Sequence, residues 1–174
     1  MEMKDNLKVL IPEEKISQRI KELAKQISED YEGRNVHLIC ILKGSIVFSC
    51  DLAKRITVPV TFDFMSVSSY GNETVSSGRV RILKDLDESI QGKDVLIIED
   101  IIDSGRTLSY LKDLLSSRAP KSLEICTLLD KPDRRETEVE VKYVGFEIPD
   151  KFVVGYGLDY NQFYRNLPYV GVIE

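Results

Sequence analysis

The sequence predicts an α/β fold in which a mostly parallel, twisted sheet is flanked by helices on both faces. The main observation is that strand-length apolar segments alternate with helical segments along most of the chain. The second is composition, since 43% hydrophobic and 30% charged side chains are typical of a globular protein with a real core. At 174 residues we expect a single domain over residues 1–174.

The first predicted helix covers residues 11–31, with Pro12 in its first turn and Gly33 just beyond its end. Its apolar residues recur at the spacing of one helix face, and they are Ile16, Ile20, Leu23, Ala24 and Ile27. A buried strand over 35–45 follows, and then a second helix over 46–56.

The next predicted strand, residues 59–70, is rich in β-branched and aromatic side chains. Segment 71–78 is polar and small, and 79–86 alternates again, so we expect a long hairpin with a mobile loop at its tip. Residues 93–100 form the predicted central strand. A helix and a strand follow it, at 107–119 and 122–131. Three short strands without intervening helices end the chain, at 143–148, 152–157 and 169–173, and we expect them to form a small subdomain over the sheet rim.

Composition excludes several classes of function. The net charge of -5 argues against non-specific binding of nucleic acid, and no apolar run is long enough to span a membrane. The N-terminal segment lacks the apolar core of a signal peptide, so we expect a cytoplasmic protein. Cys40, Cys50 and Cys126 lie in apolar surroundings and are predicted to be reduced, buried thiols. With one histidine, His37, and no C-x-x-C motif, a zinc site is not expected, and His37 is assigned a structural role.

Two adjacent acids, Glu99 and Asp100, end the predicted central strand. Such a pair is either a set of turn or cap acids or part of a site, with roughly even odds when the pair is taken alone. Ligands of parallel sheets bind beyond the carboxyl ends of the strands, and this places Lys43-Gly44, Glu99-Asp100 and Lys131 at one rim.

The turn after the acids favours a functional site. In "DSGRT", Gly105 permits a tight backbone path, Ser104 and Thr107 supply hydroxyls, and a helix N-terminus follows. These features suit a phosphate, and a phosphate beside two carboxylates suits a phosphorylated sugar whose hydroxyls donate to the acids. Neither the Walker A pattern nor G-x-G-x-x-G is present.

The stretch "VLIIEDIIDSGRTL" at 95–108 resembles the phosphoribosyl-diphosphate signature of type I phosphoribosyltransferases. Further segments resemble the hypoxanthine-guanine phosphoribosyltransferases, short bacterial forms included: "LKGS" at 42–45, "SSYG" at 68–71, "LLDK" at 128–131 and the block 145–173. The signature is shared by members with different bases, whereas the C-terminal block is far more specific.

The resemblance implies purine salvage, in which 5-phosphoribose passes from phosphoribosyl diphosphate to N9 of hypoxanthine or guanine. The products would be IMP or GMP and pyrophosphate, with Mg²⁺ as the cofactor. Glu99 and Asp100 would hold the ribose hydroxyls directly or through Mg²⁺, and Asp103 would take the N7 proton of the purine. The 5′-phosphate would be bound by Asp103, Ser104, Gly105, Arg106 and Thr107, with Arg106 ranked below the two hydroxyls.

For the purine, the resemblance implies that Lys131 donates to O6, Phe152 stacks on the base and Val153 contacts it through its backbone. Asp159 would ligate Mg²⁺ together with Glu99 and Asp100. Without the resemblance, an exposed strand-end lysine and a core phenylalanine would be the better interpretations of Lys131 and Phe152.

The leaving pyrophosphate would be held by Arg165 and by the Lys43-Gly44 loop, whose Lys43–Gly44 bond is often a non-proline cis peptide in this family. Ser69 and Tyr70 would open a mobile loop that closes over the site, although a hairpin tip without function has the same composition. The hood over the base would consist mainly of about 140–174 plus the N-terminal segment.

Departures from the family pattern are few. Ser104 and Arg106 stand where other members often carry Thr and Lys, so the hydroxyl and the charge are retained. Gly157 replaces an alanine of some members, which is expected to loosen the hood slightly. Family members are dimers or tetramers, so a homodimer or homotetramer is expected.

Two alternatives stay open from the sequence. One is a regulatory protein that keeps the fold but binds RNA or DNA; the acidic balance and the set of Lys131, Phe152 and Asp159 argue against it. The other is an enzyme that prefers xanthine, which differs from hypoxanthine at C2, where backbone contacts decide.

Overall fold

The computed structural model describes residues 6–69 and 80–174, which form one large and one small sheet with flanking helices. The large sheet has the order β4-β3-β2-β5-β6-β7, with bounds β2 (Val36–Leu42), β3 (Val60–Ser69), β4 (Val80–Lys84), β5 (Asp94–Ile102), β6 (Ser122–Asp130) and β7 (Tyr143–Glu147). The helices are α1 (Glu13–Asp30), α2 (Ile46–Ala53), α3 (Arg106–Ser116) and a short 3-10 helix, η1 (Pro132–Arg134). The small sheet has the order β1-β9-β8, with bounds β1 (Leu7–Ile11), β8 (Val153–Val154) and β9 (Val170–Ile173).

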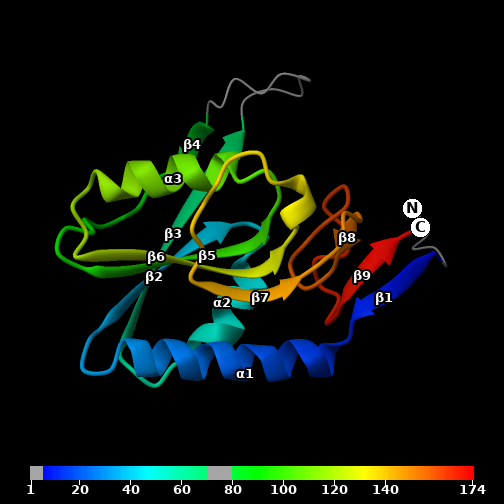
Figure 1. Cartoon of the computed structure of the whole chain (residues 1–174), viewed down its shortest axis with the longest axis horizontal. Coiled ribbons are helices and arrows are strands. Elements are labelled where there is room, and N and C mark those ends of the chain that lie inside the picture. Colours follow the sequence, from blue (N-terminus) through cyan, green and yellow to red (C-terminus); the bar gives the residue numbers. More distant parts are fainter. Residues whose placement is uncertain (1–5, 70–79) are drawn as a thin grey trace.

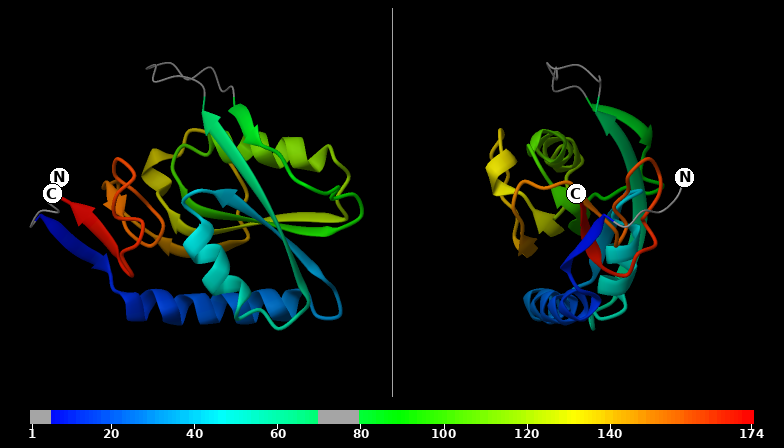
Figure 2. Two further views of the ribbon diagram at one scale, coloured as in Figure 1. Left: turned by 180° about the vertical axis from the view of Figure 1, so that it is seen from behind. Right: turned by 90° about the vertical axis from the view of Figure 1, so that its right-hand side faces the viewer.

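Helices cover both faces of the large sheet, with α1 and α2 on one side and α3 on the other (Figures 1 and 2). Strand β5 lies between them: Leu96 and Ile98 pack into the core beneath α1 and α2, whereas Val95 and Ile97 pack into the core beneath α3. Successive side chains of a strand point to opposite faces, so a strand covered on both faces must be apolar at every position. The predicted α/β fold is confirmed.

The helices form where the sequence predicted them. All five apolar positions of α1 are buried, and Pro12 stands at its N-cap with an extended ψ of 156°. In α3, Leu108, Leu111 and Leu115 are buried, as the helical spacing of these leucines predicts.

Within the large sheet, as described for residues 6–69 and 80–174, β2, β3, β5, β6 and β7 are parallel, and β4 alone runs antiparallel, as the partner of β3. The predicted hairpin pairing is therefore confirmed for the described residues. Its tip, including Tyr70, lies outside them.

The small sheet forms a hood beside the carboxyl edge of the large one, and it joins the two ends of the chain. Strand β9 pairs with β1 on one side and with β8 on the other, so the N- and C-terminal strands lie side by side (Figure 1). The three C-terminal strands do not share this sheet, because β7 pairs in parallel with β6 at the edge of the large sheet. The expectation that 143–148 belongs to the small subdomain was therefore wrong.

Two further predictions need correction. Strand β5 continues through Ile101 and Ile102, which pair with β6, so Glu99 and Asp100 lie inside the strand and do not end it. Cys50 is exposed on α2, whereas Cys40 and Cys126 are buried, and all three thiols are free. Apolar neighbours in sequence did not bury Cys50, because a helix turns one side to solvent. Among residues 6–69 and 80–174, no helix is long and apolar enough to cross a membrane.

Candidate active site

The predicted rim segments meet at the carboxyl edge of the large sheet. Gly44, just after β2, lies so close to β5 that a Cβ built on it would stand 1.7 Å from Asp100 Oδ2. The hood reaches the same point, since a Cβ on Gly157 would stand 2.1 Å from the carbonyl oxygen of Gly44. Gly157 also has φ +99°, a conformation that glycine adopts without strain. Gly157 therefore permits close packing of the hood onto the Lys43-Gly44 loop, contrary to the expected loosening.

The loop contains a non-proline cis peptide, but not at the Lys43–Gly44 bond where the family resemblance led us to expect it. It is the Leu42–Lys43 bond, one peptide before Lys43–Gly44.

The acid pair of β5 is held by backbone hydrogen bonds. Ile101 N–H donates to Asp100 Oδ1 at 2.7 Å, and Asp100 N–H donates to Glu99 Oε1 at 3.0 Å. Burial, and then the charge of Asp100, raise the pKa of Glu99 well above its usual value. Burial also raises the pKa of Asp100, opposed by hydrogen bonds and by the charge of Arg165. A nearby cation would stabilise the ionised forms of these two adjacent carboxyl groups, whose pKa values are raised.

The turn between β5 and α3 forms a cavity of about 200 Å³ that also includes Glu99. Its polar lining contains Asp103, Ser104, Gly105 and Thr107. Gly105 has φ +83°, and a Cβ there would stand 2.5 Å from the carbonyl oxygen of Thr137, so the backbone path needs glycine. The structure thus joins an acid of the pair to the predicted phosphate turn in one cavity, next to the N-terminus of α3.

Residues 131–137 brace this turn from a distant part of the sequence. Glu136 N–H and Thr137 N–H donate to the carbonyl oxygen of Ser104 at 2.9 and 3.0 Å. Arg135 Nε donates to the carbonyl oxygen of Asp103 at 3.2 Å, and its Nη2 pairs with the carboxylate of Asp130. Arg135 was not predicted as a site residue, because it stands in the charged run "KPDRRE", a pattern that is typical of a solvated turn.

Arg106 forms an ion pair with Glu136, at the start of α3. This pair ties the turn to the same bracing segment, and the lower rank of Arg106 among the phosphate-binding residues stays a prediction.

Lys131 is buried, with only 8% of the residue exposed, so an exposed strand-end lysine is the wrong description. Its Nζ lies 3.6 Å from Asp103 Oδ1, while the Asp103 side chain remains 51% exposed. The backbone N–H of Lys131 donates to the carbonyl oxygen of Ile102 at 3.0 Å, which fixes the end of β6 against the end of β5. A buried lysine side chain therefore lies next to the accessible carboxylate at the start of the phosphate turn.

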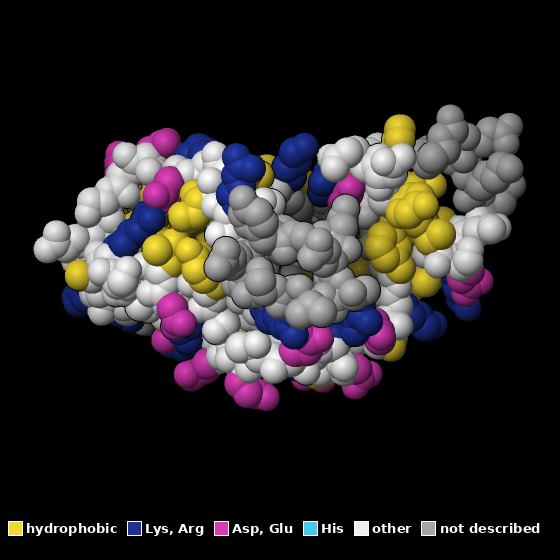
Figure 3. Space-filling model, turned by 90° about the horizontal axis from the view of Figure 1, so that it is seen from above, with side chains coloured by type: hydrophobic (Ala, Val, Ile, Leu, Met, Phe, Trp, Pro, Cys, Tyr) yellow, Lys and Arg dark blue, Asp and Glu magenta, His cyan; other side chains and the backbone are white. Residues whose placement is uncertain are grey.

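The hood turns an aromatic side chain outward. Phe152 is 53% exposed, so it is not a core residue, and its ring meets that of Tyr160 edge-to-face at 5.7 Å. The next residue, Val153, is buried in β8 together with Val154. Figure 3 shows hydrophobic side chains gathered at the end of the molecule that carries the hood.

A polar cluster connects the hood to the Lys43-Gly44 loop. Gln162 Oε1 accepts from Lys43 Nζ at 3.4 Å and from Arg165 Nη2 at 3.3 Å. Arg165 Nη1 donates to the carbonyl oxygen of Gly157 at 2.8 Å, and Nη2 lies 3.3 Å from Asp159 Oδ1. Gln162 was not predicted as a site residue, because a glutamine in a loop has no sequence pattern that indicates a function.

The remaining predicted residues are placed as follows. Asp159 Oδ2 accepts from Gln162 N–H at 2.8 Å. In the described part of the chain, no three acidic, histidine or cysteine side chains converge as a metal site, so Asp159 does not form one cluster with Glu99 and Asp100. Ser69 is the last residue of β3, where it pairs with Val80, and Tyr70 lies outside the described residues.

Comparisons with known proteins agree with this geometry. A family model described as a phosphoribosyl transferase domain matches residues 10–161. A hypoxanthine phosphoribosyltransferase of Salmonella typhimurium is 57% identical over 173 residues, which cover 98% of this chain and 97% of that protein. The bifunctional protein TilS/HprT of Listeria monocytogenes is 56% identical over 170 residues, and the chain spans only 26% of its length. The crystal structure of a hypoxanthine phosphoribosyltransferase from Staphylococcus aureus superimposes with a TM-score of 0.94 at 53% identity, over 99% of this chain and 97% of that one. The chain belongs to the phosphoribosyl transferase family.

Proposed function

We propose that the protein transfers 5-phosphoribose from phosphoribosyl diphosphate to N9 of hypoxanthine or guanine, giving IMP or GMP and pyrophosphate. The observation that carries the proposal is the buried Lys131, whose ammonium lies 3.6 Å from Asp103 beside the phosphate turn. This pairing supplies a donor for a purine O6 and an acceptor for a purine N–H next to a sugar-phosphate cavity. Two of the relatives above are named for the first of these bases, hypoxanthine.

The sugar phosphate is held by β5 and the start of α3. The hydroxyls of Ser104 and Thr107 and the backbone N–H groups at the α3 N-terminus bind the 5′-phosphate. Glu99 and Asp100 accept from the ribose hydroxyls, and this positions C1′ for attack by the purine. Lys43 and Arg165 bind the pyrophosphate, and their contacts to Gln162 hold the two cations on one side of the site.

The acid pair fits Mg²⁺, because two adjacent carboxylates offer hard oxygen ligands and burial raises the pKa of both. When bound, Mg²⁺ neutralises charge on the pyrophosphate leaving group. The carboxylate of Asp159 is engaged by Arg165 and Gln162, so its assignment as a third ligand stays a prediction.

The purine is recognised by Lys131, Phe152 and Val153, and Asp103 acts on its proton. Lys131 donates to O6, and an adenine would present an amino group there and leave two donors facing each other, at a cost of about 1–3 kcal/mol. Phe152 stacks on the base, consistent with its outward ring, and the backbone of Val153 contacts the base. Asp103 accepts the N7 proton as the bond from C1′ to N9 forms.

The test is a comparison of purines. Purified protein is incubated with phosphoribosyl diphosphate, Mg²⁺ and one of hypoxanthine, guanine, xanthine or adenine, and nucleotide and pyrophosphate are quantified. The expected products are IMP and GMP, with no AMP. Nucleotide formation from none of the four bases would refute the proposal and favour a regulatory protein, and faster formation of XMP would move the preferred base to xanthine. Light scattering on the same sample tests the expected homodimer or homotetramer.

A further inference from the structure

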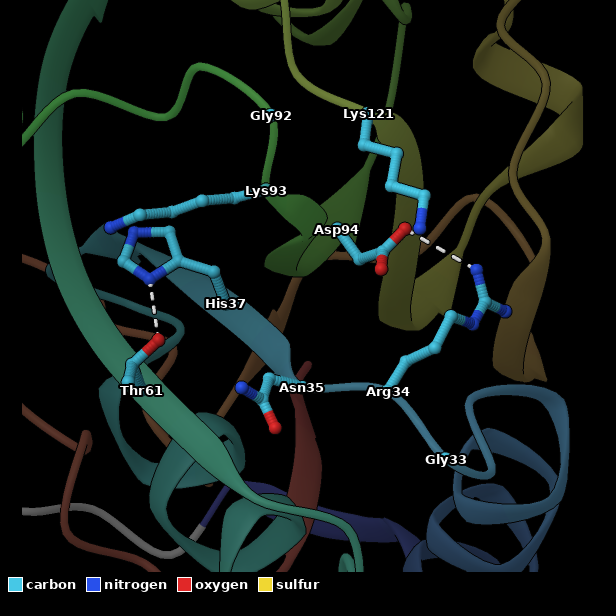
Figure 4. A pocket seen from close by; sticks show the side chains of 9 residues that line it. All are labelled: Gly33, Arg34, Asn35, His37, Thr61, Gly92, Lys93, Asp94 and Lys121. Carbon is cyan, nitrogen blue, oxygen red and sulfur yellow. Dashed lines mark hydrogen bonds and ion pairs between the residues drawn. The ribbon is translucent and has the colours of Figure 1, made fainter.

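A second polar cavity, of about 390 Å³, lies at the opposite edge of the large sheet. It is bordered by segments that lead into β2, β5 and β6, so it lies at the amino ends of these strands (Figure 4). Glycines open part of its wall, since a Cβ built on Gly33 or Gly92 would meet no atom within 4 Å. None of the residues assigned to sugar, phosphate or purine above takes part in it.

The lining is positively charged, although the chain as a whole carries a net charge of -5. Three cations, Arg34, Lys93 and Lys121, and one acid, Asp94, contribute to it. The carboxylate of Asp94 is already used, because Arg34 Nη1 lies 3.3 Å and the hydroxyl of Ser122 lies 2.6 Å from its Oδ1.

The charges of the two lysines are little neutralised by the described side chains. Among the residues that the structure describes, the one acidic partner of Lys93 Nζ is the exposed Glu88, at 3.4 Å. No side-chain partner of Lys121 is found within 6–69 and 80–174. Figure 4 shows both lysines on the border of the cavity.

The single histidine of the chain also lines this cavity, and half of its hydrogen-bonding capacity is unused. His37 is 3% exposed, and its Nδ1 lies 2.7 Å from Thr61 Oγ1. Its buried Nε2 has no hydrogen-bond partner among the described residues. Burial, and then the charge of Lys93, lower the pKa of His37, and both effects favour the neutral ring. When Nδ1 accepts the Thr61 hydroxyl hydrogen, Nε2 carries the ring hydrogen and becomes a donor without an acceptor.

We propose that this cavity binds a small phosphorylated anion, with Lys93, Lys121 and Arg34 supplying the positive charge and His37 lying in the cavity wall. A phosphate group supplies what the cavity lacks, namely negative charge and several acceptor oxygens. The volume is in the range of small-molecule sites, roughly 300–1,000 Å³, so pyrophosphate or a mononucleotide fits the size. The cavity is thus a second anion site, separated from the first by the length of the parallel strands.

The histidine is also the probe that tests the proposal. In protein labelled with ¹⁵N-histidine, all imidazole signals come from this cavity, whatever binds at the other edge of the sheet. The protein is titrated first with inorganic pyrophosphate and then, in a second series, with AMP. Saturable movement of the Nε2 resonance is expected. Movement with pyrophosphate alone indicates a free phosphate anion as ligand, and stronger movement with AMP indicates a phosphate ester.

Matched lysine variants separate direct binding from an effect relayed across the sheet. Lys93→Ala/Lys121→Ala should weaken the apparent Kd by about tenfold or more, the loss expected for charge-assisted hydrogen bonds. The control Lys8→Ala/Lys15→Ala removes two exposed lysines outside the cavity and should leave the titration unchanged. Circular dichroism checks that each variant is folded. The proposal is overturned if neither anion moves the Nε2 resonance, or if the cavity variant titrates like the wild type.

Discussion

Replacing Gly44 with alanine should move the Asp100 carboxylate and thereby weaken the use of phosphoribosyl diphosphate. The three atoms nearest to a Cβ at this position all belong to Asp100: Oδ2 at 1.7 Å, Cγ at 2.8 Å and Cβ at 3.6 Å. Ordinary contact begins at 3.4 Å, so Oδ2 would have to retreat by about 1.7 Å.

The size of the effect follows from the preferred rotamer and the hydrogen bond that Asp100 would lose. A side chain forced off its rotamer costs about 0.5–1.5 kcal/mol, and a lost hydrogen bond from Ile101 N–H to the charged carboxylate costs about 1.5–3 kcal/mol. We therefore expect a loss of about 2–4 kcal/mol in transition-state binding. At about 1.4 kcal/mol per factor of ten, kcat/KM for phosphoribosyl diphosphate at saturating hypoxanthine should fall roughly 30- to 1,000-fold.

A double-mutant cycle tests the cause. In an Asp100→Ala background only the 3.6 Å contact between the two Cβ atoms remains, so the alanine at 44 should fit. The φ of Gly44 is not in the left-handed region, and Gly44→Ala should then stabilise by about 0.4–1 kcal/mol through the unfolded state. Chemical denaturation measures this change in the free energy of unfolding. The steric argument would be refuted if Gly44→Ala alone kept the wild-type kcat/KM. It would also be refuted if Gly44→Ala destabilised the wild type and the Asp100→Ala variant equally.

Four further substitutions probe the site. Asp103→Asn should lower kcat by about 10²-fold or more while the Kd of phosphoribosyl diphosphate changes little; unchanged turnover would remove Asp103 from the chemistry. Lys131→Ala should raise KM for hypoxanthine at least about tenfold, and a loss confined to phosphoribosyl-diphosphate affinity would contradict its assignment to O6. Arg135→Gln should raise KM for phosphoribosyl diphosphate several-fold by releasing the phosphate turn, whereas replacing Arg134, whose side chain is 59% exposed, by Gln should leave KM as in the wild type; equal effects would show that local charge matters and bracing does not. Burial raises the folded-state pKa of Glu99, so the protonated form is favoured in the fold and stability is lost as pH rises through that pKa. Glu99→Gln should therefore raise Tm near pH 8 and not near pH 4, and the same gain at both pH values would argue against a charge effect.

The local patterns of the sequence predicted most of the large sheet and its helices. Strand β5 and helix α3 could be located because period-2 and period-3.6 patterns are properties of consecutive residues. The same holds for the turn at 103–107, where glycine, hydroxyls and a helix start follow one another. Such features depend on bonds and contacts within one segment, and the sequence carries them directly.

Features that depend on distant segments were missed or wrong. Strand β7 looks like the strands of the hood, and only its pairing with β6 assigns it to the large sheet. Arg135 reads as a surface charge until its contact to the Asp103 carbonyl, 32 residues away, is known.

The site likewise combines features that follow from local sequence with features that depend on distant segments. The sequence by itself determined which residue types stand near the carboxyl ends of β2, β5 and β6, because motif and strand share one stretch of chain. The tertiary structure decided that Lys131 is buried beside Asp103, that Phe152 faces outward, and that Gly44 leaves no room beside Asp100. It also decided that His37 borders a cationic cavity at the far edge of the sheet. Burial and proximity arise from the packing of segments far apart in the chain, and a pattern within one segment does not specify them.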